Sequence, residues 1–308
     1  MDKIEQTLGQ LFKGRDFEKE YEMLKQKVLS YPPIISFLNE NKELLNEQTV
    51  NQNLSKLYEF MLEHKKNQNK EETLMPGYAP KLSLEGSYIS VVYYATEEKK
   101  QADRKKAFEK RIRSLYMPKQ ILEANLNDFD LDNASRNAAF IAAEEFLSAY
   151  KDSKSVKMLK GLYIHGEFGT GKSYLLGAIA KNLAEFGVTS TLVYLPEFMR
   201  EIKQSIADNT VGDKIQFAKE TDILMLDDIG AESMTAWTRD EVLGAILQFR
   251  MQEELPTFFS SNFSMDYLET ELMFTKNGSE ERMKARRLME RVRYLSKEVE
   301  LNGRNRRH

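Results

Sequence analysis

Apolar residues recur at helical spacing through the first part of the chain, up to about Lys66. Examples are Leu8, Leu11 and Phe12, then Tyr21, Leu24 and Val28, and further on Leu54, Leu57, Tyr58, Met61 and Leu62. This spacing collects apolar side chains on one face of each helix, so it predicts a helical N-terminal unit. Pro32-Pro33 is expected to end one helix and open the next, because proline is tolerated in a helix's first turn but not in its interior.

After Pro76-Gly77 the apolar residues change to a period of two. Leu82 and Leu84 come before a Glu85-Gly86 turn, and a run from Tyr88 to Tyr94 follows it. Alternation on both sides of a turn that contains glycine is typical of a β-hairpin. We therefore expect residues 1–100 to form a mainly helical domain with a small β-hairpin.

The remainder of the chain alternates between helical and strand patterns. A charged, helix-favouring stretch and the break at Met117-Pro118 predict a linker helix over 101–118 and a second domain over 119–308. In that domain a helix is predicted over 134–150, and apolar strand candidates lie at 162–165, 191–195, 223–226 and 257–260. Strands that alternate with helices predict an α/β domain with a parallel sheet.

A glycine-rich loop follows the first of these strand candidates. Residues 166–173, Gly-Glu-Phe-Gly-Thr-Gly-Lys-Ser, match the phosphate-loop (Walker A) pattern G-x-x-x-x-G-K-[ST] without a gap, between a strand and a helix as the motif requires. Backbone N–H groups and the helix N-terminus suit phosphate oxygens, Lys172 supplies a point charge, and the Ser173 hydroxyl can ligate magnesium. The predicted nucleotide-binding residues are Gly166, Glu167, Phe168, Gly169, Thr170, Gly171, Lys172, Ser173 and Tyr174.

Two polar positions follow later strand candidates. Asp227 and Asp228 end the strand at 223–226, where Asp227 can hold magnesium together with Ser173 and Asp228 can polarise the attacking water. Asn262 follows the strand at 257–260, which would carry its amide to the γ-phosphate side of a parallel sheet. The alternative for all three side chains is that they cap helices.

Composition narrows the class of protein further. The chain has 308 residues, enough for two domains, and a net charge of −3, which gives no whole-chain attraction to nucleic acid. It has no cysteine and only His64, His165 and His308, widely separated, so we expect no structural zinc site. No apolar run is long enough to cross a bilayer and no signal sequence opens the chain, so we expect a cytoplasmic protein without a membrane partner.

Basic residues gather at the C-terminal end. Between Arg282 and His308 there are ten lysines and arginines and three acidic residues. A solvated helix face and a surface that contacts nucleic acid or a phosphate across a subunit boundary both explain this excess, and both stay open.

Four of these segments together resemble the AAA+ ATPases of the bacterial replicative-helicase loaders. They are the phosphate loop, Leu226-Asp227-Asp228, Ser260-Ser261-Asn262 and the stretch 287–293. With Pro76-Gly77-Tyr78 and residues 124–129, the resemblance extends over nearly the whole chain to the DnaI type of primosomal loader of Gram-positive bacteria.

The resemblance implies an ATPase that uses ATP and magnesium in DNA replication, with hydrolysis coupled to helicase loading. The N-terminal domain would dock onto the hexameric ring of the replicative DNA helicase, and the ATPase domain would bind single-stranded DNA, with several copies associating on the helicase. By the same resemblance, Asn262 matches the first sensor and Arg291 the arginine finger, with Arg293 as the other candidate. Arg307 would correspond to a second sensor.

Two points stay open at this stage. Loaders of this type are associated with a zinc-binding N-terminal domain, which this chain cannot build from thiolates because it has no cysteine. Either the metal has been lost from this member while the fold persists, or the domain is arranged differently. The alternative function is that of a transposition-helper ATPase with the same core, which would bind duplex DNA and a transposase. The predicted N-terminal hairpin domain argues for the loader.

Overall fold

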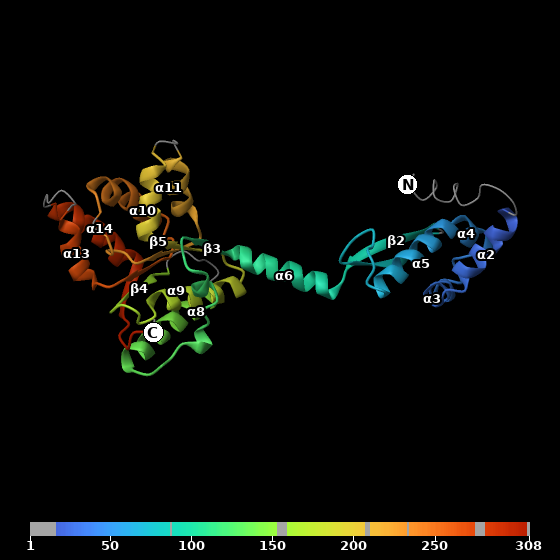
Figure 1. The fold of residues 1–308 in the computed structure, drawn as a ribbon, viewed down its shortest axis with the longest axis horizontal. Helices are drawn as coiled ribbons and strands as arrows, with labels where there is room; N and C mark the ends of the chain where they lie inside the picture. The colour runs from blue at the N-terminus through green and yellow to red at the C-terminus, as the bar shows by residue number, and fades with distance from the viewer. Residues whose placement is uncertain are drawn as a thin grey trace. The chain divides into compact units, whose positions relative to one another are not determined.

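The computed structural model describes residues 17–86, 88–152, 159–206, 210–232, 234–274 and 281–306 (Figure 1). The chain divides into two compact units, Met1–Arg104 and Lys105–His308, which are described separately below. Leu8, Leu11, Phe12 and Arg307, which the sequence analysis singles out, lie outside the described residues.

The N-terminal unit combines helices with a β-hairpin, as the apolar pattern predicts. Its elements are α2 (Phe17–Leu29), α3 (Pro32–Glu40), α4 (Glu47–Gln52), α5 (Leu54–Gln68), β1 (Tyr78–Glu85) and β2 (Tyr88–Ala95), and the helix α6 (Glu97–Arg111) begins in this unit. The two strands pair antiparallel, with Leu82 opposite Val91 and Leu84 opposite Ile89. Apolar side chains of the helices and of the hairpin form one core, which holds the hairpin against the helices.

Polar side chains of α5 and its N-cap also fasten the hairpin and the segment before it. The buried Glu63 carboxylate accepts a hydrogen bond from the Leu74 N–H at 2.8 Å, and Asn67 donates to the Tyr78 carbonyl at 3.1 Å. Asn53 accepts from the Ile89 N–H at 3.1 Å. No group of three or more histidine or acidic side chains among the described residues could hold a metal ion. Apolar packing and the hydrogen bonds from α5 and its N-cap hold the hairpin and the segment before it.

The second unit is built on a six-stranded sheet in which every pairing is parallel. Its order is β3-β5-β6-β7-β4-β8. The strands are β3 (Ile112–Leu115), β4 (Gly161–His165), β5 (Ser190–Tyr194), β6 (Ile223–Asp227), β7 (Thr257–Ser261) and β8 (Ser296–Glu300). The four inner strands are those that the sequence predicts. The edge strands β3 and β8 are not predicted, and β3 occupies positions where the sequence predicts the linker helix to continue.

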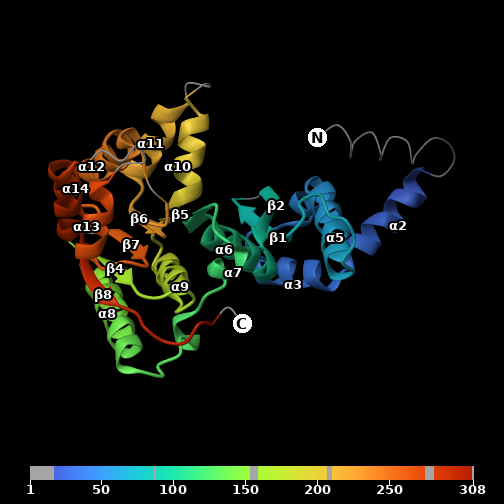
Figure 2. The same cartoon turned by 60° about the vertical axis from the view of Figure 1, so that its left-hand side comes forward.

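Helices cover both faces of this sheet, as Figure 2 shows. The helices of this unit are α7 (Lys119–Leu122), the 3₁₀ helix η1 (Leu126–Asp128), α8 (Ala134–Asp152), α9 (Lys172–Glu185), α10 (Leu195–Gln204), α11 (Val211–Glu220), the π-helical turn η2 (Thr238–Leu243), α12 (Gly244–Gln252), α13 (Met265–Met273) and α14 (Arg282–Leu295). One apolar core lies between α8, α9 and the sheet, and a second lies between the sheet and α10 to α14. No helix in the described ranges has the length and apolar character needed to span a membrane.

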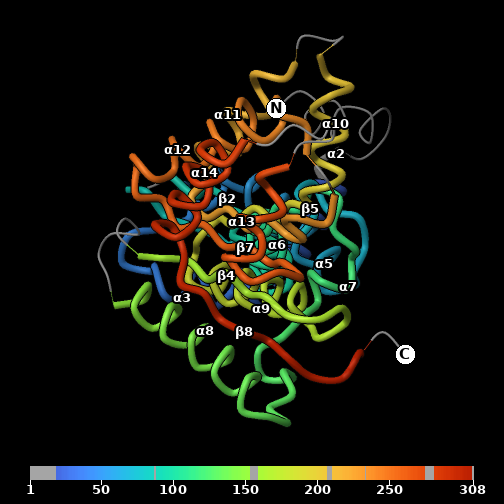
Figure 3. Tube along the Cα trace, turned by 90° about the vertical axis from the view of Figure 1, so that its left-hand side faces the viewer, coloured from blue at the N-terminus to red at the C-terminus, as the bar shows by residue number. Residues whose placement is uncertain are grey.

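The strand order decides where the polar loops meet. β7 lies between β6 and β4, so the segments that follow these three strands leave the sheet side by side at its carboxyl edge. In open parallel sheets ligands bind at this edge. Past β8 the chain runs on beside α8, where the Asn302 N–H donates to the Ser135 hydroxyl at 2.8 Å (Figure 3). It then reaches the loop after β4, where the Arg306 N–H donates to the Gly169 carbonyl at 2.9 Å.

Candidate functional site

Three glycines shape the loop between β4 and α9. Gly166, Gly169 and Gly171 have φ angles of 154°, 75° and 101°, a region that other residues rarely adopt. A Cβ atom on Gly169 would stand 1.9 Å from Oδ1 of Asn305, and one on Gly166 would stand 2.1 Å from the Leu301 carbonyl oxygen. Glycine is therefore required here both by the backbone angles and by the close approach of the C-terminal segment.

Lys172 ties this loop to the end of β7. Its Nζ donates to the carbonyl oxygens of Gly166 and Glu167, each at 2.8 Å, and to Oδ1 of Asn262, also at 2.8 Å. Lys172 is only 8% exposed, so its charge is directed at these acceptors and at the adjoining cavity. The structure thus brings together a lysine and an asparagine that lie ninety positions apart in the sequence.

Asp227 and Ser173 form a second contact across the site. The Ser173 hydroxyl lies 2.8 Å from Oδ1 and 2.9 Å from Oδ2 of Asp227, and the Ser260 hydroxyl also donates to Oδ1. Burial raises the pKa of the Asp227 carboxyl above its usual value, and the hydrogen bonds from Ser260 and Ser173 act in the opposite direction. A hydroxyl and a carboxylate oxygen side by side are ligands of the kind that Mg²⁺ prefers.

Asp228 turns the chain away from the sheet. Its φ of 66° lies in the left-handed region, and its N–H donates to the Ser260 hydroxyl at 2.9 Å. Its carboxylate accepts a long hydrogen bond of 3.4 Å from the Asn262 amide. Asp228 and Asn262 therefore face each other beside Lys172, instead of capping helices, and Ser264 is the residue whose side chain caps α13.

These side chains line one cavity of ≈ 880 Å³. It includes Lys172, Ser173, Asp227, Asp228 and Asn262 and, from the loop, Phe168, Gly169 and Gly171, together with Tyr174, Tyr194 and Ser260. Three of the predicted loop residues do not line it. Gly166 and Glu167 offer carbonyls to Lys172, and the Thr170 hydroxyl, fully buried, donates to the Glu167 carbonyl at 3.0 Å.

The other end of the cavity contains residues that the sequence analysis does not single out. Arg136 is 2% exposed, donates to the Thr170 carbonyl at 2.6 Å, and lies 4.2 Å from the Phe129 ring centre. Arg306 lines the cavity and pairs with Asp130 and Asp132. Nothing in the pattern of an amphipathic helix marks Arg136, and only its contact with the Thr170 carbonyl shows that it supports this loop.

The arginine-finger candidates lie elsewhere in the unit. Arg291, on α14, donates to the Gly244 carbonyl at 2.7 Å and lines a separate cavity of ≈ 530 Å³ with Arg287 and Arg293. Arg293 is bonded to Glu269 at 2.8 Å and to Asp266 at 2.9 Å. Neither arginine reaches the large cavity of its own chain.

Ion pairs neutralise part of the basic C-terminal segment. Besides Arg293 and Arg306, Lys284 pairs with Glu281 and Asp240, and Lys297 lies 3.5 Å from Glu145. Several basic residues of this segment are therefore paired with carboxylates of the same unit.

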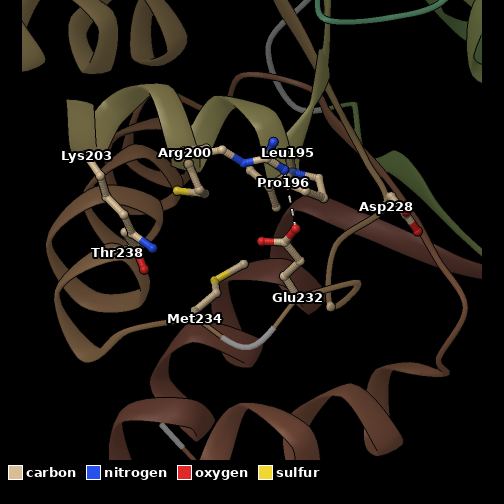
Figure 4. Close-up of a pocket in the computed structure, with 10 residues that line it drawn as sticks. Leu195, Pro196, Arg200, Lys203, Asp228, Glu232, Met234 and Thr238 are labelled. Atoms are coloured by element: carbon tan, nitrogen blue, oxygen red, sulfur yellow. Dashed lines mark hydrogen bonds and ion pairs between the residues drawn. The ribbon is translucent and has the colours of Figure 1, made fainter. Parts of the chain in front are cut away.

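A smaller cavity of ≈ 170 Å³ lies beside Asp228, against α10 (Figure 4). Arg200 and Lys203 line it, and the Glu232 carboxylate points toward Arg200, 3.5 Å away. It shares Asp228 with the large cavity but contains none of Lys172, Ser173 and Asn262. The large cavity is therefore the candidate site for a nucleotide.

Comparison with known proteins gives a relative over the full length. The chain is 41% identical over 313 aligned positions to the replicative helicase loader DnaI of Bacillus subtilis (strain 168), with 100% of both chains covered. This chain belongs to the DnaI family. A family profile described as the N-terminus of primosomal protein DnaI matches residues 1–93, and one described as the bacterial DnaA ATPase domain matches residues 125–270.

Two solved structures support the same assignment for the ATPase unit. A crystal structure of DnaI is 47% identical, with a TM-score of 0.57, and the match covers 65% of this chain and 99% of that one. A primosome component from Streptococcus pyogenes serotype M3 is 42% identical, with a TM-score of 0.54, covering 65% and 98%. The DnaI-family chain therefore carries an AAA+ ATPase domain behind a helical N-terminal domain.

Proposed function

We propose that this protein is an ATP-dependent loader, which binds the replicative DNA helicase and helps to place it on single-stranded DNA. The observation that carries the proposal is the large cavity, because it joins Lys172, Ser173, Asp227, Asp228 and Asn262 within a chain that aligns along its whole length with a helicase loader. A nucleotide site alone is found in proteins of many functions. The full-length alignment with a helicase loader is what favours the loader function among them.

The loop residues would hold the nucleotide. The Lys172 ammonium, now bonded to Asn262 and to two loop carbonyls, lies where it can exchange these acceptors for phosphate oxygens. Ser173 and Asp227 would hold the magnesium ion, since Mg²⁺ in nucleotide sites binds one or two protein groups and phosphate oxygens. The ion would neutralise charge on the transferred phosphoryl group.

Asp228 and Asn262 would then position and polarise the water that attacks the γ-phosphate. Their side chains contact each other, and Asp228 lines the same cavity as Lys172, so a water beside the γ-phosphate would lie within their reach. Nucleotide can control loading only if the ATP-bound form has a different affinity for helicase or DNA from the ADP-bound form.

Each of the two units would bind a different partner. The N-terminal unit would dock onto the hexameric helicase, as supported by the match of residues 1–93 to the DnaI N-terminus. The ATPase unit would bind single-stranded DNA through its backbone phosphates, in a manner that is sensitive to salt and tolerant of sequence. Copies of the loader would associate on the helicase and complete each other's nucleotide sites with Arg291.

The test of this function is the native mass of the full-length chain mixed with the replicative helicase of its own organism, with and without ATP. We expect a discrete complex whose amount or stoichiometry depends on ATP, and we expect the dependence to disappear in the Lys172→Ala variant. No complex under any nucleotide condition would overturn the loader assignment. Binding to duplex DNA and a transposase would then favour the transposition-helper class.

Asp228→Asn should leave nucleotide binding intact and lower the rate of ATP hydrolysis by about 10²-fold, because the amide cannot accept a proton or polarise water as the carboxylate does. The measurement is steady-state phosphate release in the presence of helicase and DNA, alongside binding of a fluorescent ATP analogue. Asp222→Asn is the matched control, since Asp222 precedes the same strand at its other end and is exposed. Full turnover by Asp228→Asn would reject Asp228 as the water-polarising group.

A further inference from the structure

Ser260 occupies a distinctive position beside the two aspartates. It lies near the end of β7, is 1% exposed, and follows Phe259, which pairs with Leu226 of β6. Its hydroxyl donates to Oδ1 of Asp227 and accepts the Asp228 N–H at 2.9 Å. One hydroxyl group thus joins the side chain of one aspartate to the backbone of the next.

We propose that Ser260 is a positioning residue for the nucleotide-bound magnesium, which holds the Asp227 carboxylate at the metal position and fixes the turn that aims Asp228. This inference rests on the proposed function, because it concerns the same nucleotide site. It adds Ser260, from β7, to Ser173 of the loop motif and Asp227 of β6, the two residues proposed to hold magnesium.

Ser173 and Ser260 both donate to Asp227, but they differ in what they do once nucleotide and magnesium are bound. Ser173 donates to both oxygens of Asp227, but its own oxygen is the atom expected to ligate magnesium. In that state the ion fixes where this oxygen lies, and its single proton serves one acceptor at a time, so its hold on the Asp227 carboxylate depends on the metal. Ser260 has no such second task, because it approaches Oδ1 from β7, so it can orient the carboxylate throughout. Groups that orient metal-binding side chains commonly change metal affinity by about 10- to 100-fold when removed.

The second bond concerns the backbone of Asp228. A residue other than glycine with a φ of 66° is held there by its surroundings, and the acceptor for its N–H is the Ser260 oxygen. Without that acceptor, a backbone donor beside a buried strand end loses its partner, and the turn is free to relax. Only a side chain that donates and accepts at once can satisfy both groups, and the Ser260 hydroxyl does so through a single atom.

The test is the magnesium dependence of nucleotide binding by the full-length protein, followed with a fluorescent ATP analogue over a range of Mg²⁺ concentrations and in EDTA. For Ser260→Ala we expect the Mg²⁺ concentration for half-maximal binding to rise by about 10-fold or more. Binding in EDTA should change by less than about threefold, because Lys172 and the loop remain. Ser260→Thr, which keeps the hydroxyl, should restore most of the magnesium dependence.

Ser261→Ala is the matched control. Ser261 is the next residue of the same strand, is equally buried, and donates to the Ile229 carbonyl at 2.7 Å without contacting Asp227. It should alter thermal stability and leave the magnesium requirement unchanged. If Ser260→Ala does not fold, Ser260→Cys provides a nearly isosteric chain with a weak donor, and the same rise is expected.

The outcomes separate the two proposals. A wild-type magnesium requirement in folded Ser260→Ala or Ser260→Cys, or an equal rise in Ser261→Ala, would overturn the positioning role and leave the loader function standing. A wild-type chain that binds no ATP analogue at any Mg²⁺ concentration would overturn the proposed nucleotide site and this inference with it.

Discussion

Lys172→Ala is expected to weaken ATP binding by about three orders of magnitude. Its ammonium is the charged donor in the phosphate loop that lines the cavity, and each hydrogen bond to a charged group contributes about 1.5–3 kcal/mol. The variant also leaves the carbonyls of Gly166 and Glu167 and the Asn262 side chain without this donor, so the loop loses part of what shapes it. Equilibrium titration with a fluorescent ATP analogue measures the loss.

Lys181→Ala serves as the control for this variant. Lys181 lies on the same helix, α9, and its substitution removes the same charge from the chain at a position that does not line the cavity. We expect its ATP affinity to stay within about twofold of the wild type. An affinity of Lys172→Ala within threefold of the wild type would mean that nucleotide does not bind at this loop.

Short-range sequence signals were enough to predict the central part of this fold. The phosphate loop is contiguous, and its strand and helix flank it directly, so a local pattern specifies the local structure. The inner strands are apolar on both faces because helices cover both sides of the sheet, which makes them recognisable as short apolar runs. The parallel arrangement then implied that Asp227 and Asn262 would lie at one edge.

The edge strands could not be predicted in the same way. β8 reads Ser-Lys-Glu-Val-Glu, and three of its five residues are exposed, so its composition resembles that of the charged helix before it. β3 follows a charged helix directly and contains Arg113 and Ser114. Strands at an edge have one side in solvent and little apolar content, and their pairing with β4 and β5 is decided by tertiary structure.

Contacts between distant segments were equally hidden from the sequence. Ser260 sits in a run of serines and phenylalanines, and its relation to Asp227 appears only when β6 and β7 are paired in register. Arg136 lies in an ordinary helical pattern, and its bond to Thr170 depends on how α8 packs behind the loop. Motifs therefore identified the groups that we propose to contact nucleotide, whereas the groups that hold them in place required the fold.

Arg291 is the stronger candidate for the arginine finger on structural grounds. Arg293 would have to leave Glu269 and Asp266 to reach a neighbour, whereas Arg291 makes no ion pair within the described residues and is bonded to the Gly244 carbonyl. Burial and the nearby Arg287 lower the pKa of Arg291, but an arginine keeps its charge at neutral pH. A guanidinium that is not already neutralised is the better group to approach a γ-phosphate.

Arg291→Ala should therefore leave ATP binding by the isolated protein within about twofold of the wild type, and lower helicase-stimulated ATP turnover by about 10³-fold, the range found for arginine fingers supplied in trans. Arg293→Ala is the control from the same helix and should retain most of the stimulated turnover. Comparing single-turnover rates with ATP dissociation constants distinguishes a slower hydrolysis step from weaker ATP binding.

A mixing experiment distinguishes a trans-acting finger from a structural role. Lys172→Ala cannot bind ATP and Arg291→Ala cannot complete a neighbour's site, so each alone should be inactive. In an equimolar mixture on the helicase, some interfaces between neighbouring loaders join the intact loop of an Arg291→Ala copy to the intact Arg291 of a Lys172→Ala copy. If neighbours pair at random, about a quarter of the interfaces have this arrangement, so about a quarter of wild-type turnover should return. A mixture no more active than its components would reject the trans-acting finger, and so would normal turnover in Arg291→Ala alone. Recovery of turnover would show that a nucleotide site is completed by two copies of the loader.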